Sequence, residues 1–285
     1  MTTLHEYDTV EHLPCGSVIQ HGPNNNRIYL MRPGEQCPEE LPRTLIEMAQ
    51  ERGYTKIFAK VPVQKIESFL LAGYYAEAIV PGFYNGRETG VFLAYCKDRV
   101  RKSETNEEKN LQNTELAVEH KGCACAEALP QGLRIRACQK TDAEEMAGIY
   151  QSVFPSYPFP IHDPEFIKDS MDENVSYFCA EDEEGIAALS SIEADALCSN
   201  AELTDFATLP RWRGKGLGTL LLCTMEKELK KRGIATAYTI ARAASAGMNI
   251  VFARQGYRYA GRLCNNTHIS GQIESMNVWY KNMRV

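Results

Sequence analysis

Residues 201–222, AELTDFATLPRWRGKGLGTLLL, predict a strand, a tight turn and a helix in direct succession. An extended run ends at Pro210. The turn that follows is dense in glycine, and glycine lets the backbone adopt positive φ and pass close to a ligand. Hydrophobic residues then recur at helical spacing, at Leu217, Leu221, Met225 and Leu229. This order is typical of a turn that presents the start of a helix to a ligand.

The ligand that suits this turn is a phosphate group. The first turn of a helix has free N–H groups and lies at the positive end of the helix dipole. Arg211, Arg213 and Lys215 add positive charge in a chain whose net charge is −6. The turn matches neither GxxxxGK[ST] of triphosphate sites nor GxGxxG of dinucleotide sites. A glycine-rich turn can also be only a tight connection, but the cations and the strand–turn–helix order favour phosphate binding.

Downstream of the turn, helices and strands alternate. The helix ends in Lys230–Lys231–Arg232–Gly233, and cations followed by glycine are typical of a helix C-terminus. A strand is predicted at 235–240, a short helix at 248–255, and two closing strands at 259–263 and 276–281. Alternating strands and helices predict an α/β fold.

An earlier segment repeats this order of elements. Its predicted helices lie at 41–52 and 63–72, and its predicted strands lie at 56–61, 75–80 and 90–96. ERGYTKIFAK…LLAGYY, within 51–75, is loosely similar to KRGIATAYTI…ARQGYR, within 231–258. Any two βα segments look somewhat alike, so a degenerate half-domain repeat and a chance likeness both remain open.

A polar stretch separates the two segments. KDRVRKSETNEEKN, at 97–110, has one apolar side chain, and such a stretch cannot bury enough surface to offset its ordering entropy. We therefore expect an N-terminal α/β half-domain at 1–98, a partly mobile polar linker at 99–131 and a larger α/β domain at 132–285. If the repeat is real, the two segments should pack with pseudo-symmetry.

The pattern RxxGxG at Arg213, Gly216 and Gly218, preceded by Pro210, resembles the pyrophosphate-binding signature of GNAT acetyltransferases. The resemblance implies a GNAT fold, a mixed central sheet flanked by helices, with acetyl-CoA as co-substrate. It implies that the end of the preceding strand, at Ala207 and Thr208, pairs with the pantetheine arm. It also implies that backbone amides of the turn hold the CoA pyrophosphate, at Gly214, Lys215, Gly216, Leu217, Gly218 and Thr219.

A closer resemblance, to the β-lysine N-acetyltransferase family, spans nearly the whole chain. It is carried by SVIQHGPNNNRIYLM at 17–31, SVFPSYPFPIHDP at 152–164 and LCNNTHISGQIESMNVWYK at 263–281. That family makes Nε-acetyl-β-lysine, an osmolyte of methanogenic archaea and some bacteria, and the substrate assignment comes from this resemblance alone. Two other interpretations remain: a non-catalytic module that binds or senses acyl-CoA, and an acetyltransferase for another amine or a protein lysine.

Acetyl transfer to such an amine requires a group that accepts a proton. A lysine-like ammonium has a pKa near 10.4, so only about one molecule in a few thousand is nucleophilic at neutral pH. The resemblance implies a carboxylate on the strand before the phosphate turn, where Glu202 and Asp205 are the catalytic candidates. Strand alternation places them on opposite faces, and we favour Glu202 as the base. A solvated or ion-paired glutamate remains the alternative.

The resemblance also implies a general acid on the last short helix, where many relatives have tyrosine. Counting back from Gly256 places Phe252 at that position, and phenylalanine cannot donate a proton. Another group, or water, must then protonate the leaving thiolate. The same count places Ser245 where relatives have an asparagine that contacts pantetheine, with Asn249 one turn further as the alternative.

The acceptor site is expected beneath a loop rich in proline and aromatic residues, at 155–163, which contains Tyr157 and Phe159. In GNAT folds this region usually covers the acceptor, and Glu274 and Asn277 form the opposite wall in the family picture. His162 is a weak candidate for a base, because a lone loop histidine is more often a capping or surface group. Asn265–Asn266 is read as a turn between strands.

The overall composition of the chain limits the classes of binding partner that we expect. A pI near 5.6 argues against binding nucleic acid over a broad surface. No apolar run approaches the roughly 18 residues that cross a bilayer, and the N-terminus lacks a signal-peptide layout, so we expect a cytoplasmic protein without a membrane partner. The cysteines form no CxxC pair, and Cys123 with Cys125 has no matching second pair, so no metal is expected. The chain is expected to be a monomer or a homodimer.

Overall fold

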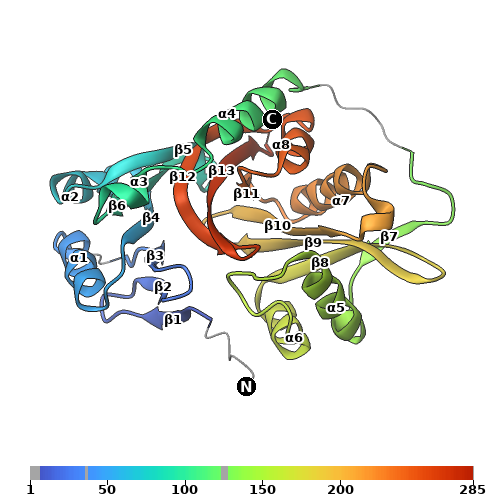
Figure 1. Ribbon diagram of the computed structural model, residues 1–285, viewed down its shortest axis with the longest axis horizontal. Helices are drawn as coiled ribbons and strands as arrows, with labels where there is room; N and C mark the ends of the chain where they lie inside the picture. Colours follow the sequence, from blue (N-terminus) through green and yellow to red (C-terminus); the bar gives the residue numbers. More distant parts are fainter. Residues whose placement is uncertain (1–6, 36–37, 123–127, 285) are drawn as a thin grey trace.

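The computed structural model describes residues 7–35, 38–122 and 128–284, and its α/β architecture agrees with the prediction. A mixed sheet of 13 strands runs through both halves of the chain, in the order β1-β2-β3-β4-β6-β5-β12-β13-β11-β10-β9-β8-β7 (Figure 1). Cys123 and Cys125 lie outside the described residues. No helix in the described ranges is long and apolar enough to cross a membrane.

The C-terminal half contributes seven strands and four α-helices among its described residues. The strands are β7 (Arg134–Ala137), β8 (Val175–Asp182), β9 (Gly185–Asp195), β10 (Asn200–Thr208), β11 (Thr236–Arg242), β12 (Arg258–Ile269) and β13 (Gln272–Asn282). The helices are α5 (Ala143–Val153), α6 (Pro164–Glu173), α7 (Leu217–Lys231) and α8 (Ala246–Arg254).

The N-terminal half contributes six strands and two α-helices among its described residues. The strands are β1 (Thr9–His12), β2 (Val18–Gly22), β3 (Arg27–Arg32), β4 (Lys56–Pro62), β5 (Tyr75–Tyr84) and β6 (Glu88–Cys96). The helices are α1 (Leu41–Glu51) and α2 (Ile66–Leu71).

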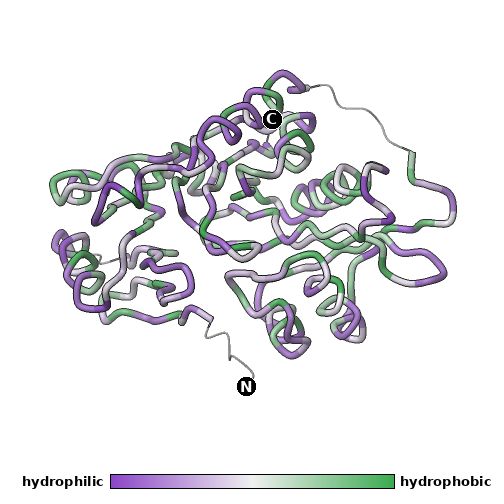
Figure 2. The backbone as a smooth tube through the Cα atoms, viewed as in Figure 1, coloured by the Kyte–Doolittle hydropathy of each residue, from purple (hydrophilic) through white to green (hydrophobic). Residues whose placement is uncertain are grey.

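Helices cover both faces of the C-terminal sheet. The apolar stripe of α7 faces the sheet, as predicted from its spacing: Leu221, Met225 and Leu229 are fully buried. Together with α8 this stripe forms one hydrophobic core, and α5 and α6 form a second core on the opposite face (Figure 1). Figure 2 shows the pattern along the helices, where hydrophobic and hydrophilic stretches alternate around each coil.

The strand order establishes the half-domain repeat. In the C-terminal half, β9-β10-β11-β13-β12 contains one parallel pair, β10 with β11. In the N-terminal half, β2-β3-β4-β6-β5 has the same order, and its one parallel pair is β3 with β4. Helices α1 and α2 follow these strands where α7 and α8 follow theirs. The two halves are therefore related copies of one arrangement.

The two copies join edge to edge through β5 and β12, where Gly261 pairs with Ala78. Gly261 has φ of 147°, and a Cβ there would lie 2.1 Å from the carbonyl oxygen of Glu77, so this position requires glycine. The join makes the sheet continuous and brings the N-terminal copy beside the C-terminal copy, in agreement with the expected pseudo-symmetric packing.

The segment expected as a partly mobile linker is instead largely helical. It contains α3 (Arg99–Lys102) and α4 (Glu107–Glu119), and α4 lies alongside α8 (Figure 1). Its buried face is mostly polar: Asn110, Thr114 and Ala117. The Thr114 hydroxyl and the backbone carbonyl of Asn110 accept hydrogen bonds from the C-terminal sheet. Burial of this face therefore does not depend on apolar surface, which is the reason the composition was misleading.

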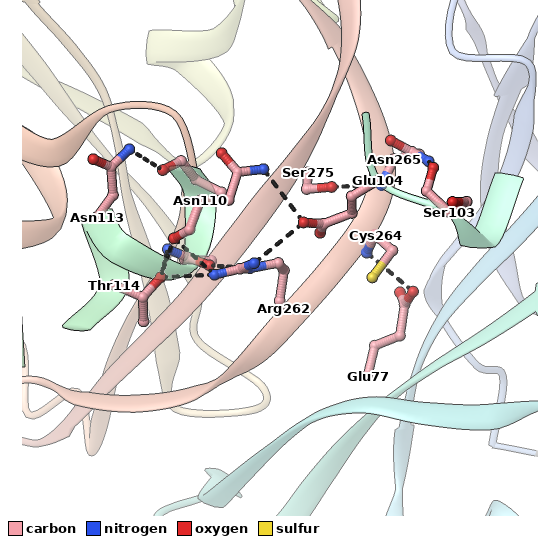
Figure 3. A network of polar contacts seen from close by, with 12 residues as sticks. Glu77, Ser103, Glu104, Asn110, Asn113, Thr114, Arg262, Cys264, Asn265 and Ser275 are labelled. Atoms are coloured by element: carbon pink, nitrogen blue, oxygen red, sulfur yellow. Dashed lines mark hydrogen bonds and ion pairs between the residues drawn. The ribbon is translucent and has the colours of Figure 1, made fainter. Parts of the chain in front are cut away.

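Arg262 of β12 is the centre of that contact (Figure 3). Its Nη2 donates to the carbonyl of Asn110 at 2.9 Å and to Thr114 Oγ1 at 2.8 Å. Its Nη1 forms an ion pair with Glu104 at 3.2 Å, and the side chains of Arg262 and Glu104 are 13% and 4% exposed. Asn113 donates to the carbonyl of Ala243 at 3.1 Å. The helix is thus held by directional polar contacts to the strand that carries the join.

Candidate active site

The predicted phosphate turn has an open, glycine-dependent geometry. It follows a 3-10 turn at Pro210–Trp212, and both Gly214 and Gly216 have positive φ, 75° and 76°. Gly216 is the N-cap of α7, so the first amides of the helix, from Leu217 to Thr219, have no partner within it. A Cβ on Gly214 would meet nothing within 4 Å, which leaves room for a ligand above the turn.

Two cations flank this turn without a carboxylate partner among the described residues. Lys215 Nζ lies 4.2 Å from the ring centroid of Trp212, and Arg213 Nε donates to the carbonyl of Thr208 at 3.2 Å. Arg211 is different, because it pairs with Glu184 at 2.6 Å. Arg213 and Lys215 therefore supply the positive charge at the turn.

Strands β10 and β11 diverge beside the turn. They pair in parallel only from Asn200 to Glu202, whereas β10 continues to Thr208. Ala207 and Thr208 still pair with β9 on one side, so their other backbone edge faces the gap between the diverging strands. Such an edge can receive an extended ligand arm through backbone hydrogen bonds.

A β-bulge in β10 changes which side chains point into the molecule. The register with β9 shifts between Thr204 and Ala207, and Asp205 has φ of 54°. The regular alternation expected for this strand therefore breaks, and Glu202 and Asp205 line the same cavity instead of opposite faces. The expectation that only one of them faces the ligand was wrong for this reason.

That cavity has a volume of about 950 Å³ and lies between the two copies. Its C-terminal wall includes Glu193, Glu202 and Asp205, and Tyr157 and Phe159 from the predicted acceptor loop. Ser245, Met248 and Phe252 also line it. Its N-terminal wall includes side chains from β3, β4 and the end of β5: Arg27, Tyr29, Phe58, Lys60 and Phe83.

Glu202 and Glu193 face each other across β10 and β9, directly opposite in register. Burial raises the pKa of both carboxyl groups. For Glu202, nearby Lys60 and a hydrogen bond from Tyr238 counteract part of that effect. For Glu193, the charges of Glu202 and Asp205 raise the pKa further, well above its ordinary value. The two groups therefore differ in their surroundings: a cation and a hydrogen-bond donor favour the charged form of Glu202, whereas neighbouring carboxylates disfavour that of Glu193.

Asp205 is fixed by two hydroxyl donors. Tyr157 donates to Oδ1 and Ser191 donates to Oδ2 at 2.5 Å. Burial raises the pKa of Asp205, and these hydrogen bonds lower it in part. Both oxygens of Asp205 are therefore engaged by hydroxyl groups, and Asp205 orients Tyr157 at the cavity wall.

Lys60 comes from the N-terminal copy and approaches this carboxylate cluster. Its Nζ donates to Tyr238 Oη at 3.2 Å and lies 5.2 Å from the ring centroid of Tyr29. Burial alone would lower the pKa of Lys60, but Tyr29 and Glu202 raise it above the ordinary value. Lys60 therefore remains a cation, linked to Glu202 through Tyr238.

Known proteins resemble the chain both locally and over nearly its full length. A family model described as the acetyltransferase (GNAT) family matches residues 143–257. The beta-lysine N(6)-acetyltransferase of Methanococcus maripaludis is 37% identical over 265 residues, which are 93% of this chain and 96% of that protein. The chain belongs to the β-lysine N-acetyltransferase family of GNAT enzymes.

Two further relatives also match over most of their length. The beta-lysine N(6)-acetyltransferase of Methanosarcina mazei is 32% identical, over 85% of this chain and 96% of that protein. N-acetyltransferase YodP of Bacillus subtilis is 30% identical, over 94% of this chain and 96% of that protein. The likeness includes the N-terminal copy, so that copy is a part of the family and not an appended module.

Three residues expected at the GNAT site lie elsewhere. Asn249 is fully buried, and its Oδ1 accepts from Trp279 and Asn277, both at 2.8 Å, while its Nδ2 donates to the carbonyls of Arg242 and Ser245. Glu274 is paired with Arg242 through two bonds of 2.7 and 2.9 Å. Asn249, Asn277 and Glu274 do not line the cavity; they are structural, because their polar atoms are bonded within the fold.

Phe252 lines the cavity, and its ring is nearly perpendicular to those of Phe206 and Tyr257. Ser245 also lines the cavity, so of the two residues considered for pantetheine it is the one that remains available. Glu193, Lys60 and Arg27 were missed. Glu193 had one usable signal, a charged residue within an otherwise buried run; for Lys60 and Arg27 only the packing of the two copies reveals the role.

Proposed function

We propose that this protein transfers an acetyl group from acetyl-CoA to the ε-amine of β-lysine. The observation that carries the proposal is a carboxylate-lined cavity at the bulge of β10, in a chain that is similar over its whole length to beta-lysine N(6)-acetyltransferases. The cavity is large enough for a small amino acid and the reactive end of the cofactor, since ligand cavities run from about 300 to 1,000 Å³.

Acetyl-CoA would bind with its pyrophosphate over the turn from Gly214 to Thr219, where helix amides and the cations of Arg213 and Lys215 are directed toward it. Its pantetheine arm would enter the gap between β10 and β11 along Ala207 and Thr208. This path leads the thioester to the part of the cavity that Ser245 and Phe252 line.

Proton removal is assigned to Glu202. The incoming ε-ammonium loses its proton to this carboxylate, and the free amine attacks the thioester carbonyl. The carbon–sulfur bond then breaks, and the CoA thiolate leaves. Glu202 suits this role because burial raises its pKa, which makes it a stronger base, while Lys60 and the hydrogen bond from Tyr238 favour its ionised form. The attacking nitrogen must also lose its second proton as the amide forms. Phe252 has no proton to give, so water in the gap would carry this second proton from the nitrogen to the thiolate.

The product, Nε-acetyl-β-lysine, carries one ammonium and one carboxylate and has no net charge at neutral pH. We infer that it serves as a compatible solute. A neutral zwitterion accumulates without a counterion, whereas free β-lysine, with two ammonium groups and one carboxylate, requires one. The acetylation step thus converts a cation into a solute that adds no net charge.

A turnover assay tests this function. Thiol release and mass spectrometry should give monoacetylated β-lysine as the preferred product over acetylated α-lysine, spermidine and a lysine-containing peptide. Glu202→Gln should lower kcat at neutral pH and recover in part at higher pH, where free amine accumulates. Glu115→Gln, an exposed glutamate of α4, is the matched control and should behave as wild type. An unchanged kcat for Glu202→Gln at every pH would remove Glu202 as the base.

A second candidate is a module that binds acyl-CoA without chemistry. Phe252 favours it, because no hydroxyl is present at that position of the last helix. Acetyl-CoA binding by calorimetry without acetyl transfer to any of the four amines would support this second function and contradict the first.

A further inference from the structure

Arg27 and Asn266 hold unpaired polar atoms in the wall of the cavity, on the side of the N-terminal copy. Arg27 is the first residue of β3, and Asn266 lies in β12. Both line the cavity, and only 4% and 1% of their surfaces are exposed. No step of the chemistry assigned above uses either residue.

The strand pattern explains why Arg27 faces the cavity. On β3 and β4, Ile28, Leu30 and Ile57 belong to the N-terminal hydrophobic core. Arg27 and Tyr29 alternate with Ile28 and Leu30 along β3, so their side chains point to the opposite face of the sheet. The Arg27 guanidinium lies over the ring of Tyr29, 5.3 Å from its centroid. The arginine is therefore aimed at the cavity by the pleat of its strand and supported by an aromatic ring.

Arg27 has no carboxylate partner among the described residues. Its Nη1 donates to the carbonyl of Asn266 and, at 3.1 Å, to Thr267 Oγ1, and its Nε is buried without an acceptor. Lys56, another buried cation, pairs with Glu77 at 2.8 Å. Buried Arg101 also lacks a carboxylate ion pair among the described residues, but it is not among the residues that line the cavity, whereas Arg27 is. A buried, uncompensated guanidinium is costly unless a ligand supplies the anion.

Asn266 has an unpaired hydrogen-bond acceptor in its side chain. It lies where the register of β12 with β13 shifts, between Leu263 and Thr267, so the strand is distorted there rather than turned as the sequence suggested. Its Nδ2 donates to Thr267 Oγ1 at 3.3 Å, and its Oδ1 is buried with no donor. An unpaired acceptor thus lies beside an unpaired cationic donor.

The opposite wall carries the carboxylates Glu193, Glu202 and Asp205. The cavity is therefore bipolar: it is negative where an amine reacts, and it has a cation and a neutral acceptor at the side of the N-terminal copy. An amino acid with a distant second amine matches both ends. Its reactive ammonium suits the carboxylates, its carboxylate suits Arg27, and its other ammonium suits the free oxygen of Asn266.

We propose that Arg27 and Asn266 form the subsite for the amino acid end of the acceptor, Arg27 binding its carboxylate and Asn266 its second amine. The N-terminal copy then selects amino acids over plain diamines. This inference rests on the proposed function, since it takes β-lysine as the acceptor, and it assigns to the N-terminal copy a role in specificity.

Two analogues of β-lysine separate the two contacts. 1,4-Diaminopentane is β-lysine without the carboxyl group, and 6-aminohexanoate is β-lysine without the second amine. Arg27→Gln should lower kcat/KM about tenfold to a hundredfold for β-lysine and 6-aminohexanoate, and leave 1,4-diaminopentane unchanged. Asn266→Leu should lower kcat/KM for β-lysine and 1,4-diaminopentane, and leave 6-aminohexanoate unchanged.

Controls separate binding from folding. Arg43→Gln removes an exposed cation of α1 and should change none of the three values. Arg27→Lys keeps the charge and should retain more β-lysine turnover than Arg27→Gln, with acetyl-CoA affinity and Tm as checks on the fold. Where an analogue turns over too slowly, its inhibition constant against β-lysine gives the same comparison.

The outcomes are distinct. Equal losses for all three amines in a variant, or no loss for β-lysine, would overturn the subsite while leaving the proposed function intact. Absence of β-lysine turnover by the wild-type enzyme would instead overturn the proposed function. The subsite is supported if Arg27→Gln leaves kcat/KM for 1,4-diaminopentane unchanged and Asn266→Leu leaves kcat/KM for 6-aminohexanoate unchanged, while both variants lose kcat/KM for β-lysine.

Discussion

Removal of the Thr114 hydroxyl is the smallest change that tests which contacts hold α4 against the sheet. Thr114 Oγ1 accepts from Arg262 Nη2 at 2.8 Å and from Asn277 Nδ2 at 3.0 Å, and it donates to the carbonyl of Asn110 at 2.8 Å. Thr114→Val keeps the shape of the side chain and removes all three hydrogen bonds. The threonine is 6% exposed, so water does not replace them.

The expected loss of stability depends on which hydrogen bonds the partners of Thr114 keep in the variant. Arg262 Nη2 still donates to Asn110, and Asn277 Nδ2 still donates to Asn249, so no group is left entirely unpaired. Each lost bond then costs its net value of about 0.5–1.5 kcal/mol rather than a full desolvation penalty. Together they should lower the free energy of unfolding by about 1.5–4.5 kcal/mol.

Equilibrium urea unfolding measures this loss, with fluorescence of Trp279 as the probe, since its Nε1 donates to Asn249 within the same network. Thr44→Val is the matched control: its hydroxyl also donates to a carbonyl four residues back, but it is exposed on α1, and the change should stay within about 0.5 kcal/mol. A Thr114→Val protein as stable as the control would refute the reasoning that α4 is fixed by buried polar contacts.

Three further changes test the site. Gly216→Glu should abolish acetyl-CoA binding by calorimetry, because it sets a carboxylate at the phosphate turn, whereas Gly53→Glu, with the similar φ of 75° and open surroundings, should bind normally. Lys60→Met should move the acidic limb of the kcat/KM profile to higher pH, because Lys60 lowers the pKa of Glu202; an unmoved limb would contradict the link. The pKa of Glu193 is higher in the folded state than the ordinary value of about 4.5, so the free energy of unfolding falls as pH rises above that value. Glu193→Gln should therefore be more stable than wild type at neutral pH. Equal stability of the two proteins in thermal unfolding would contradict this.

Local patterns in the sequence predicted the glycine-rich turn and the helix that follows it. The turn from Arg213 to Gly218 depends on glycine conformations, and helix α7 depends on the spacing of its hydrophobic residues. Both features can be recognised from residues that lie close together in the sequence. The repeat was visible for a similar reason, since each copy keeps its own order of helices and strands. Helix α4 was missed because hydrophobic periodicity finds apolar stripes, and the buried stripe of α4 is made of Asn110, Thr114 and Ala117.

The acceptor side depends on geometry that no local pattern encodes. A bulge turned Asp205 toward the same cavity as Glu202, although regular alternation separates them. Asn249, Asn277 and Glu274 had suitable chemistry and a suitable place in the chain, but their polar atoms are satisfied inside the fold. Whether a polar side chain is free for a ligand is decided by its neighbours, which the sequence does not state.

The two copies differ at the connection that corresponds to the predicted phosphate turn. In the C-terminal copy, β10 leads into glycines and cations before α7. In the N-terminal copy, the equivalent connection, from β3 to α1, runs through Glu39 and Glu40, and Glu40 is the N-cap of α1. A carboxylate at that position repels a pyrophosphate instead of leaving helix amides free for it. The N-terminal copy therefore cannot hold CoA there, and the same strands, β3 and β4, instead direct Arg27 and Lys60 into the cavity. We therefore propose a division of labour between the copies, in which one binds the acetyl donor and the other completes the wall of the cavity that we assign to the acceptor.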